Sequence, residues 1–104
     1  MQSDEDRQGA AQIAVMTDRR FLADICKALG HPVRLRMIAF IRDAGQCLCG
    51  DIVDALPLAQ STVSQHLKVL RQAGLVRAVS DGVRMRYSVD ADAIERFKRK
   101  ILSL

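Results

Sequence analysis

The sequence predicts a single, mostly helical domain that carries one β-hairpin, and three observations lead to this prediction. The chain has 104 residues, of which 49% are hydrophobic, and this is enough for one core. Aromatic residues are limited to one Tyr and three Phe, so the core depends on aliphatic side chains that suit helix packing. The dipeptide Asp81-Gly82 separates two runs of strand-forming residues, which is typical of a hairpin turn.

The first half of the chain is predicted to begin with a flexible tail over residues 1–16, which are polar and then rich in Ala and Gln. Apolar side chains recur at helical spacing over residues 17–29, which indicates an amphipathic helix. A second helix is predicted over residues 32–42, because Pro32 suits the first helical position. One domain is therefore expected over residues 17–104.

Two more helices follow at close spacing. A short helix is predicted over residues 51–56, where Pro57 ends it, and a longer helix over residues 61–73. In the longer helix, polar side chains lie mostly on the face opposite the apolar ones. The apolar face is expected to pack on the core and consists of Val63, Leu67 and Leu70.

Strand-forming residues over 76–89 are predicted to form a two-stranded ribbon, and an amphipathic helix over residues 92–104 closes the chain. The element order is then four helices, two strands and one helix. Two helices joined by a short turn and followed by a hairpin are typical of a winged helix-turn-helix, in which the second helix of the pair enters the DNA major groove. Residues 61–73 are then the recognition helix, and residues 76–89 are the wing.

Positive charge is concentrated in this part of the chain. Residues 60–88 contain five basic side chains and a single acidic one, so they carry all of the +4 net charge. Such clustering is typical of phosphate contacts. The same stretch holds side chains that donate and accept hydrogen bonds at base edges, so double-stranded DNA is the expected partner. The predicted DNA-binding residues are Gln60, Ser61, Thr62, Ser64, Gln65, His66, Lys68, Arg84 and Arg86.

Two segments resemble known DNA-binding repressors. Residues 58–76, with the sequence LAQSTVSQHLKVLRQAGLV, resemble the recognition-helix signature of the ArsR/SmtB family, and residues 27–36 are similar to the start of that family's second helix. The resemblance covers residues 21–104. It implies a homodimer whose first and last helices pack across the two-fold axis, repression without inducer, and release from operator DNA when an inducer binds.

The N-cap of the recognition helix and the two histidines are further features of this region. The family usually has Ser or Thr at the N-cap of the recognition helix, where this chain has Ala59. Either Ser61 supplies the cap, or the helix is less stable by about 1 kcal/mol. His31, beside Pro32, is expected to shape the start of the second helix, whereas His66 is expected to face DNA.

The cysteines Cys26, Cys47 and Cys49 are candidate inducer ligands. Soft thiolates prefer thiophilic species, so the pair in Cys47-Leu48-Cys49, with Cys26 as a third sulfur, suits As(III) or Sb(III). The resemblance implies the same, because arsenic-sensing relatives often carry Cys-x-Cys at the start of the first DNA-binding helix. Here Gly50 places both thiols one position earlier than in that pattern.

The spacing of the cysteine pair suggests how sensing is coupled to DNA release. On a regular helix, two side chains that are two positions apart point in directions about 200° apart around the axis. One ion that binds both Cys47 and Cys49 would therefore distort the start of the helix, which couples binding of the ion to loss of DNA affinity. Oxidants or reactive sulfur species that act on the same thiols are the alternative signal. Cys26 taken alone is also compatible with a buried small apolar residue.

Several classes of function are not expected. No apolar run approaches the roughly 18 residues of a membrane span, and the acidic start does not resemble a secretion leader, so a cytoplasmic protein is predicted. The sequence shows no Gly-rich phosphate loop and no paired-carboxylate pocket, so neither an enzyme nor an obligatory cofactor is expected. A winged-helix module that binds only protein is the alternative from another class.

Overall fold

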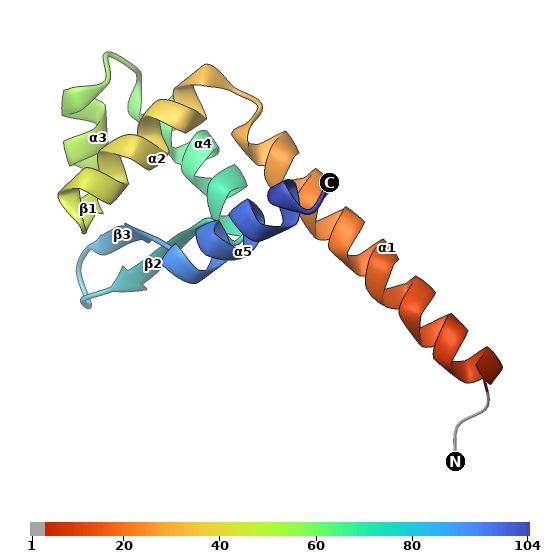
Figure 1. Ribbon diagram of the computed structural model, residues 1–104. Coiled ribbons are helices and arrows are strands. Elements are labelled where there is room, and N and C mark those ends of the chain that lie inside the picture. Colours follow the sequence, from red (N-terminus) through yellow and green to blue (C-terminus); the bar gives the residue numbers. More distant parts are fainter. Residues whose placement is uncertain (1–3) are drawn as a thin grey trace.

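The computed structural model describes residues 4–104, and it describes the side chains of residues 9, 10 and 16–104. Within these residues five helices and three strands form a mostly helical fold with a hairpin wing, which confirms the predicted fold class (Figure 1). The elements are α1 (Asp4–Leu29), α2 (Pro32–Ala44), β1 (Cys47–Leu48), α3 (Cys49–Ala55), α4 (Gln60–Gln72), β2 (Val76–Ser80), β3 (Met85–Val89) and α5 (Ala91–Leu102).

Helix α1 is longer than the sequence pattern indicates. It was expected from residue 17, but it begins at Asp4 and runs to Leu29, and Figure 1 shows its N-terminal part extending away from the other elements. The first three residues of the predicted tail lie outside the described residues, and the flexibility of residues 4–16 stays a prediction. At the other end of α1, Lys27 lies in the last turn, where a cation suits the helix dipole.

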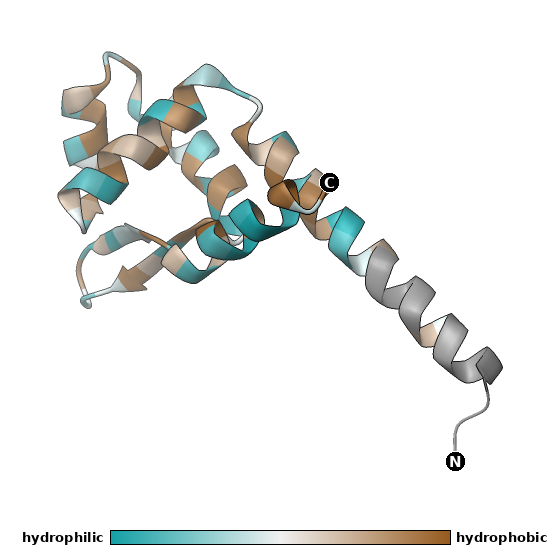
Figure 2. Ribbon diagram, viewed as in Figure 1, coloured by the Kyte–Doolittle hydropathy of each residue, from teal (hydrophilic) through white to brown (hydrophobic). Residues whose placement is uncertain are grey.

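The core forms where the first four helices meet the sheet. The predicted apolar face of α4 is confirmed, because Val63, Leu67 and Leu70 are all buried. Figure 2 shows hydrophobic and hydrophilic residues alternating along the helices, as expected when each helix buries one face only. The other buried residues come from α1, α2, α3, the sheet and the positions just after α3 and just before β2. They are Ile25, Ala28, Met37, Ile41, Cys47, Ile52, Leu56, Leu75 and Val76.

The wing is a hairpin of β2 and β3 with Ser80 opposite Met85. At its tip the Oδ1 atom of Asp81 accepts hydrogen bonds from the backbone N–H groups of Val83, at 3.2 Å, and Arg84, at 2.9 Å. Gly82 follows Asp81 with a φ of +96°, a conformation that favours glycine. The predicted Asp-Gly turn is therefore confirmed.

A third strand joins the wing to the helical part, and the sequence analysis did not predict it. In β1, Cys47 pairs with Tyr87 and Leu48 pairs with Arg86, which makes β3 the central strand of an antiparallel sheet in the order β1-β3-β2. A strand of two residues is too short to show the alternating pattern by which strands are recognised. Its pairing fixes the position of the cysteine segment against the wing.

The starts of α3 and α4 differ from the expected ones by two residues and one residue. Helix α3 begins at Cys49, and Asp51 holds this start by accepting a hydrogen bond from the N–H of Leu48 at 2.8 Å. Helix α4 begins at Gln60 with Ala59 as N-cap, and no described side chain caps it, so the alternative in which Ser61 supplies the cap is wrong. None of the described helices combines the length and the apolar character that a membrane span requires.

Candidate nucleic-acid interface

Helices α3 and α4 pack against each other and form a helix-turn-helix pair. The buried face of α4 leaves its polar side chains on the opposite side, as the sequence predicts. Most of the predicted DNA-binding residues of this helix are exposed together, and Thr62 is half-buried. The exposed ones are Gln60, Ser61, Ser64, Gln65 and Lys68.

The two wing arginines have different surroundings. Arg84 lies in the turn before β3, whereas Arg86 lies within this strand. Its side chain forms no ion pair with any described residue, whereas Nε of Arg86 lies 3.3 Å from a carboxylate oxygen of Asp81. The pKa of Asp81 is lowered mainly by hydrogen bonds from the backbone N–H groups of Arg84 and Val83, and to a smaller extent by the charges of the Arg86 and Arg84 guanidinium groups. Arg84 therefore carries the more available charge.

His66 lies apart from the exposed face of α4, which the sequence analysis did not foresee. It is half-buried, and its Nδ1 accepts a hydrogen bond from Nε of Arg34 at 3.2 Å. Its ring centroid is 4.6 Å from that of His31. Burial, and after it the charges of His31 and Arg34, lower the pKa of His66, so the neutral ring is favoured.

His31 has the structural role that the sequence predicts. It is the N-cap of α2, and its Nδ1 accepts a hydrogen bond from the N–H of Val33 at 3.2 Å. Pro32 occupies the first turn of the helix, as expected. The two histidines therefore lie where the start of α2 meets α4.

The cysteine pair lies between the wing and the helix-turn-helix. Cys47 is 3% exposed in β1, and burial, followed by the charges of Asp51 and Cys49, raises the pKa of its thiol. Cys49 is half-buried at the start of α3, with its Sγ 3.8 Å from Oγ of Ser64 in α4. Cys47 is in a strand and Cys49 begins a helix, so the expectation that both thiols lie on one regular helix is wrong.

The three thiols do not form one cluster within the chain. Cys26 is exposed on α1, so the interpretation of this residue as a buried apolar side chain is wrong. Among the described residues, no group of three or more His, Cys, Asp or Glu side chains is placed to hold a metal ion. The pair Cys47 and Cys49 is therefore the thiol site that a single chain brings next to α4.

A hollow of about 490 Å³ connects the cysteine segment to α4 and the wing. Its lining includes Cys49, Gln60 and Ser64, together with Arg84 from the wing. The sequence did not indicate this arrangement, because the three segments are brought together only by the packing of α3 on α4 and of β1 on β3.

Comparison with known proteins places the chain among DNA-binding regulators. A family model described as a helix-turn-helix domain matches residues 29–79. An uncharacterised HTH-type transcriptional regulator of Methanocaldococcus jannaschii is 36% identical over 74 residues, which are 70% of this chain and 82% of the relative. The HTH-type transcriptional repressor SmtB of Mycobacterium tuberculosis is 38% identical over 64 residues, which are 62% of this chain and 47% of the relative.

Solved structures agree with this comparison. The crystal structure of a possible transcriptional regulator for arsenical resistance is similar to the chain with a TM-score of 0.70 and 28% sequence identity. The similarity covers 77% of this chain and 82% of that one. The shared part therefore includes more than the helix-turn-helix pair alone.

Proposed function

The chain belongs to the helix-turn-helix transcriptional regulators, which are not enzymes. We propose that it is a repressor of the ArsR/SmtB family that binds operator DNA as a homodimer and is released when an inducer binds its cysteine thiolates. The observation that carries the proposal is the exposed polar face of α4 beside the basic wing. An α-helix fits the major groove, and side chains of this kind form hydrogen bonds with base edges.

The proposed DNA contacts divide into three groups. Gln60, Ser61, Thr62, Ser64, Gln65 and Lys68 contact bases and phosphates from α4. Arg84 contacts phosphates or the minor groove from the wing, and Arg86 adds to this contact while it also holds the turn through Asp81. His66 acts mainly by positioning α4, because Arg34 and His31 occupy one side of its ring.

The proposed dimer uses α1 and α5, which are held together as one surface. Asp18 of α1 lies 2.9 Å from Nζ of Lys100 and 3.8 Å from Nη2 of Arg96, both in α5. The guanidinium of Arg96 also lies 4.0 Å from the ring centroid of Phe21. Large apolar side chains remain exposed around this surface, and burial between two copies stabilises the dimer. They are Met16, Ile101, Leu102 and Leu104.

The proposed inducer is As(III), Sb(III) or a similar thiophilic species bound by Cys47 and Cys49. Thiol sulfurs are the ligands that these species prefer, and binding releases the thiol protons. Cys47 is paired with Tyr87 of the wing, and Cys49 contacts Ser64 of α4. A ligand that draws the two sulfurs together therefore moves two DNA-contacting elements relative to each other, which weakens DNA binding.

The proposal is tested with a duplex that the protein itself selects from a random-sequence pool. Wild-type protein is expected to bind this duplex with an affinity that falls steeply as salt rises, and failure to select any sequence would favour a protein-binding module instead. Arsenite is expected to release the reduced wild type. The Cys47→Ser/Cys49→Ser double variant should stay bound, and Cys26→Ser, as the matched control, should be released like the wild type.

The same assay separates the two kinds of inducer. Binding that arsenite leaves unchanged in the wild type contradicts metalloid sensing. Release by peroxide or a persulfide donor, absent in the double variant, would then assign the Cys47 and Cys49 thiols to oxidants or reactive sulfur. Release of the double variant by arsenite would show that these two thiols are not the sensor.

A further inference from the structure

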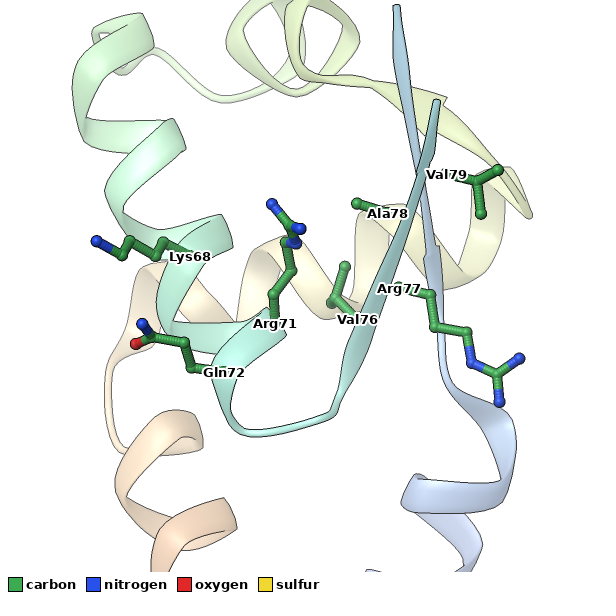
Figure 3. Close-up of a pocket in the computed structure, with 7 residues that line it drawn as sticks. All are labelled: Lys68, Arg71, Gln72, Val76, Arg77, Ala78 and Val79. Carbon is green, nitrogen blue, oxygen red and sulfur yellow. The ribbon is translucent and has the colours of Figure 1, made fainter. Parts of the chain in front are cut away.

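A second hollow lies at the other end of α4, between the C-terminal half of this helix and β2. Its volume is about 610 Å³, larger than the hollow beside the cysteines. Figure 3 shows the residues that line it: Lys68, Arg71, Gln72, Val76, Arg77, Ala78 and Val79. No acidic side chain is among them, so the lining is purely cationic in charge.

The cations of this hollow are not equally available. Lys68 and Arg71 form no ion pair or side-chain hydrogen bond with any described part of the chain, whereas Nε of Arg77 is 3.0 Å from Oδ2 of Asp90. In Figure 3 the Arg71 side chain points into the space between α4 and β2, and Arg77 points away on the far side of the strand. Arg71 is therefore an uncompensated guanidinium directed into a concave surface.

The hollow continues the polar face of α4. Ser61, Gln65, Lys68 and Gln72 are spaced by four, three and four residues, so they follow one stripe along the helix. All four are exposed. If the first part of this stripe lies on base edges, its last part, beside Arg71, lies next to the sugar-phosphate backbone at the border of the groove.

The strand on the opposite wall, β2, adds an apolar surface and an open sheet edge. In the sheet order β1-β3-β2, strand β2 lies at an edge, so one side of its backbone has no strand partner among the described residues. The N–H groups on such an edge are free to donate hydrogen bonds. Buried Val76 and half-buried Ala78 supply an apolar wall without charge. The site thus combines positive charge and hydrogen-bond donors without a competing carboxylate.

We infer that this hollow binds a backbone phosphate of the DNA duplex, with Arg71 as the main charge partner and Lys68 beside it. A guanidinium suits a phosphate because it donates two parallel hydrogen bonds. Arg71 was not among the DNA-binding residues predicted from the sequence. The inference rests on the proposed DNA binding and adds a contact site that fixes how α4 is oriented along the groove, without reading bases.

The test compares Arg71→Gln with Arg77→Gln by fluorescence anisotropy on the selected duplex over a range of salt concentrations. Log affinity falls linearly with log salt, and each lost phosphate contact makes this slope less steep by about 0.9. The Arg71 variant loses one contact in each protomer, so its slope is expected to be less steep by about 1.8 for the dimer. It should weaken binding to the selected duplex and to an unrelated duplex by the same factor. Arg77→Gln should keep the wild-type slope, because the Arg77 guanidinium points away from the hollow (Figure 3) and is paired with Asp90.

Circular dichroism and urea unfolding check that both variants keep the wild-type fold and stability. This is expected, because both residues are exposed. A wild-type slope in Arg71→Gln, or an equal loss in Arg77→Gln, overturns the phosphate site while the proposed DNA binding stands. Absence of salt-dependent binding in the wild type overturns both. Arg71→Lys, which keeps the charge but not the paired donors, is expected to keep the slope and lose part of the affinity.

Discussion

Arg34 and His66 link the end of α1 to α4 through one guanidinium group. Nε of Arg34 donates to Nδ1 of His66 at 3.2 Å, and its Nη1 donates to the carbonyl oxygens of Lys27 and Ala28 at 3.2 and 3.1 Å. The carbonyls at the end of a helix lack partners within it, so this contact satisfies two of them. The position of α4 relative to the proposed dimer helix therefore depends on Arg34.

Replacement of Arg34 is expected to destabilise the fold. Arg34→Met keeps the length of the side chain but removes all three hydrogen bonds, so the free energy of unfolding should fall by about 1–3 kcal/mol. Urea unfolding measures the change. Arg36→Met is the matched control, because Arg36 is exposed on the same helix, and it should stay close to the wild type. Equal stability of the two variants would contradict the role given to Arg34.

The stability of the protein is expected to fall in mildly acidic solution because of His66. Its pKa is lowered in the folded state from the ordinary value of 6.5, so the unfolded chain binds a proton at a higher pH than the folded chain does. The contribution of His66 to the free energy of unfolding is therefore fully present above pH 6.5. It is lost as the pH falls below this value, until the folded state is also protonated.

Urea unfolding at a series of pH values measures this dependence. His66→Gln removes the titrating ring, so its stability should change less between about pH 7 and pH 5. The carboxylates of Asp81 and Asp90 have lowered pKa values, so they stabilise the fold at neutral pH and lose this contribution only as the pH falls below their ordinary value of 3.8, outside the range tested. The same pH dependence in wild type and variant would show that His66 is not responsible.

The two neighbouring thiols should differ in reactivity. Cys47 is 3% exposed and its pKa is raised, so both access and thiolate formation are disfavoured, whereas Cys49 is half-buried. Iodoacetamide is therefore expected to alkylate Cys49 before Cys47 in the folded protein, as followed by mass spectrometry of peptides. In urea the difference should disappear. Faster labelling of Cys47 in the folded protein would contradict the burial of this thiol.

Dimerisation should depend on the apolar side chains of α5. Leu102 is 85% exposed, and a charge in its place would be buried in the proposed dimer interface. Leu102→Glu is expected to raise the dimer dissociation constant about tenfold or more in sedimentation equilibrium, which corresponds to about 1.4 kcal/mol. Val83 is 92% exposed at the wing tip, so Val83→Glu should leave the oligomeric state unchanged. A dimer that tolerates Leu102→Glu but not Val83→Glu would place the interface elsewhere.

Local sequence patterns were sufficient for most of the fold. The apolar spacing of Val63, Leu67 and Leu70 identified the buried face of α4, and Asp81-Gly82 identified the hairpin turn. These signals are strong because helix periodicity and turn chemistry involve residues close together in the chain. Helix starts were less well predicted, as at Cys49 and Gln60, because the hydrogen bonds that define a start are also satisfied by backbone and by neighbouring elements.

The candidate site was predicted less completely than the fold. Which polar side chains of α4 are exposed follows from helix periodicity, but the surroundings of Arg86 and His66 do not. Asp81 neutralises Arg86, and Arg34, 32 residues away in the chain, occupies one side of His66. Such contacts depend on how elements pack, and a single sequence carries no periodic signal for them.

The sequence by itself determined the order of elements, the apolar back and polar front of α4, the basic character of residues 60–88 and the position of the wing turn. The tertiary structure alone decided where the thiols lie and which cations are free. Pairing of β1 with β3 places Cys47 and Cys49 between the wing and α4. Packing of α4 against β2 leaves Arg71 in a hollow without an ion-pair partner among the described residues. The physical reason is range: propensity and periodicity act between near neighbours, whereas burial and charge compensation depend on residues brought together only by folding.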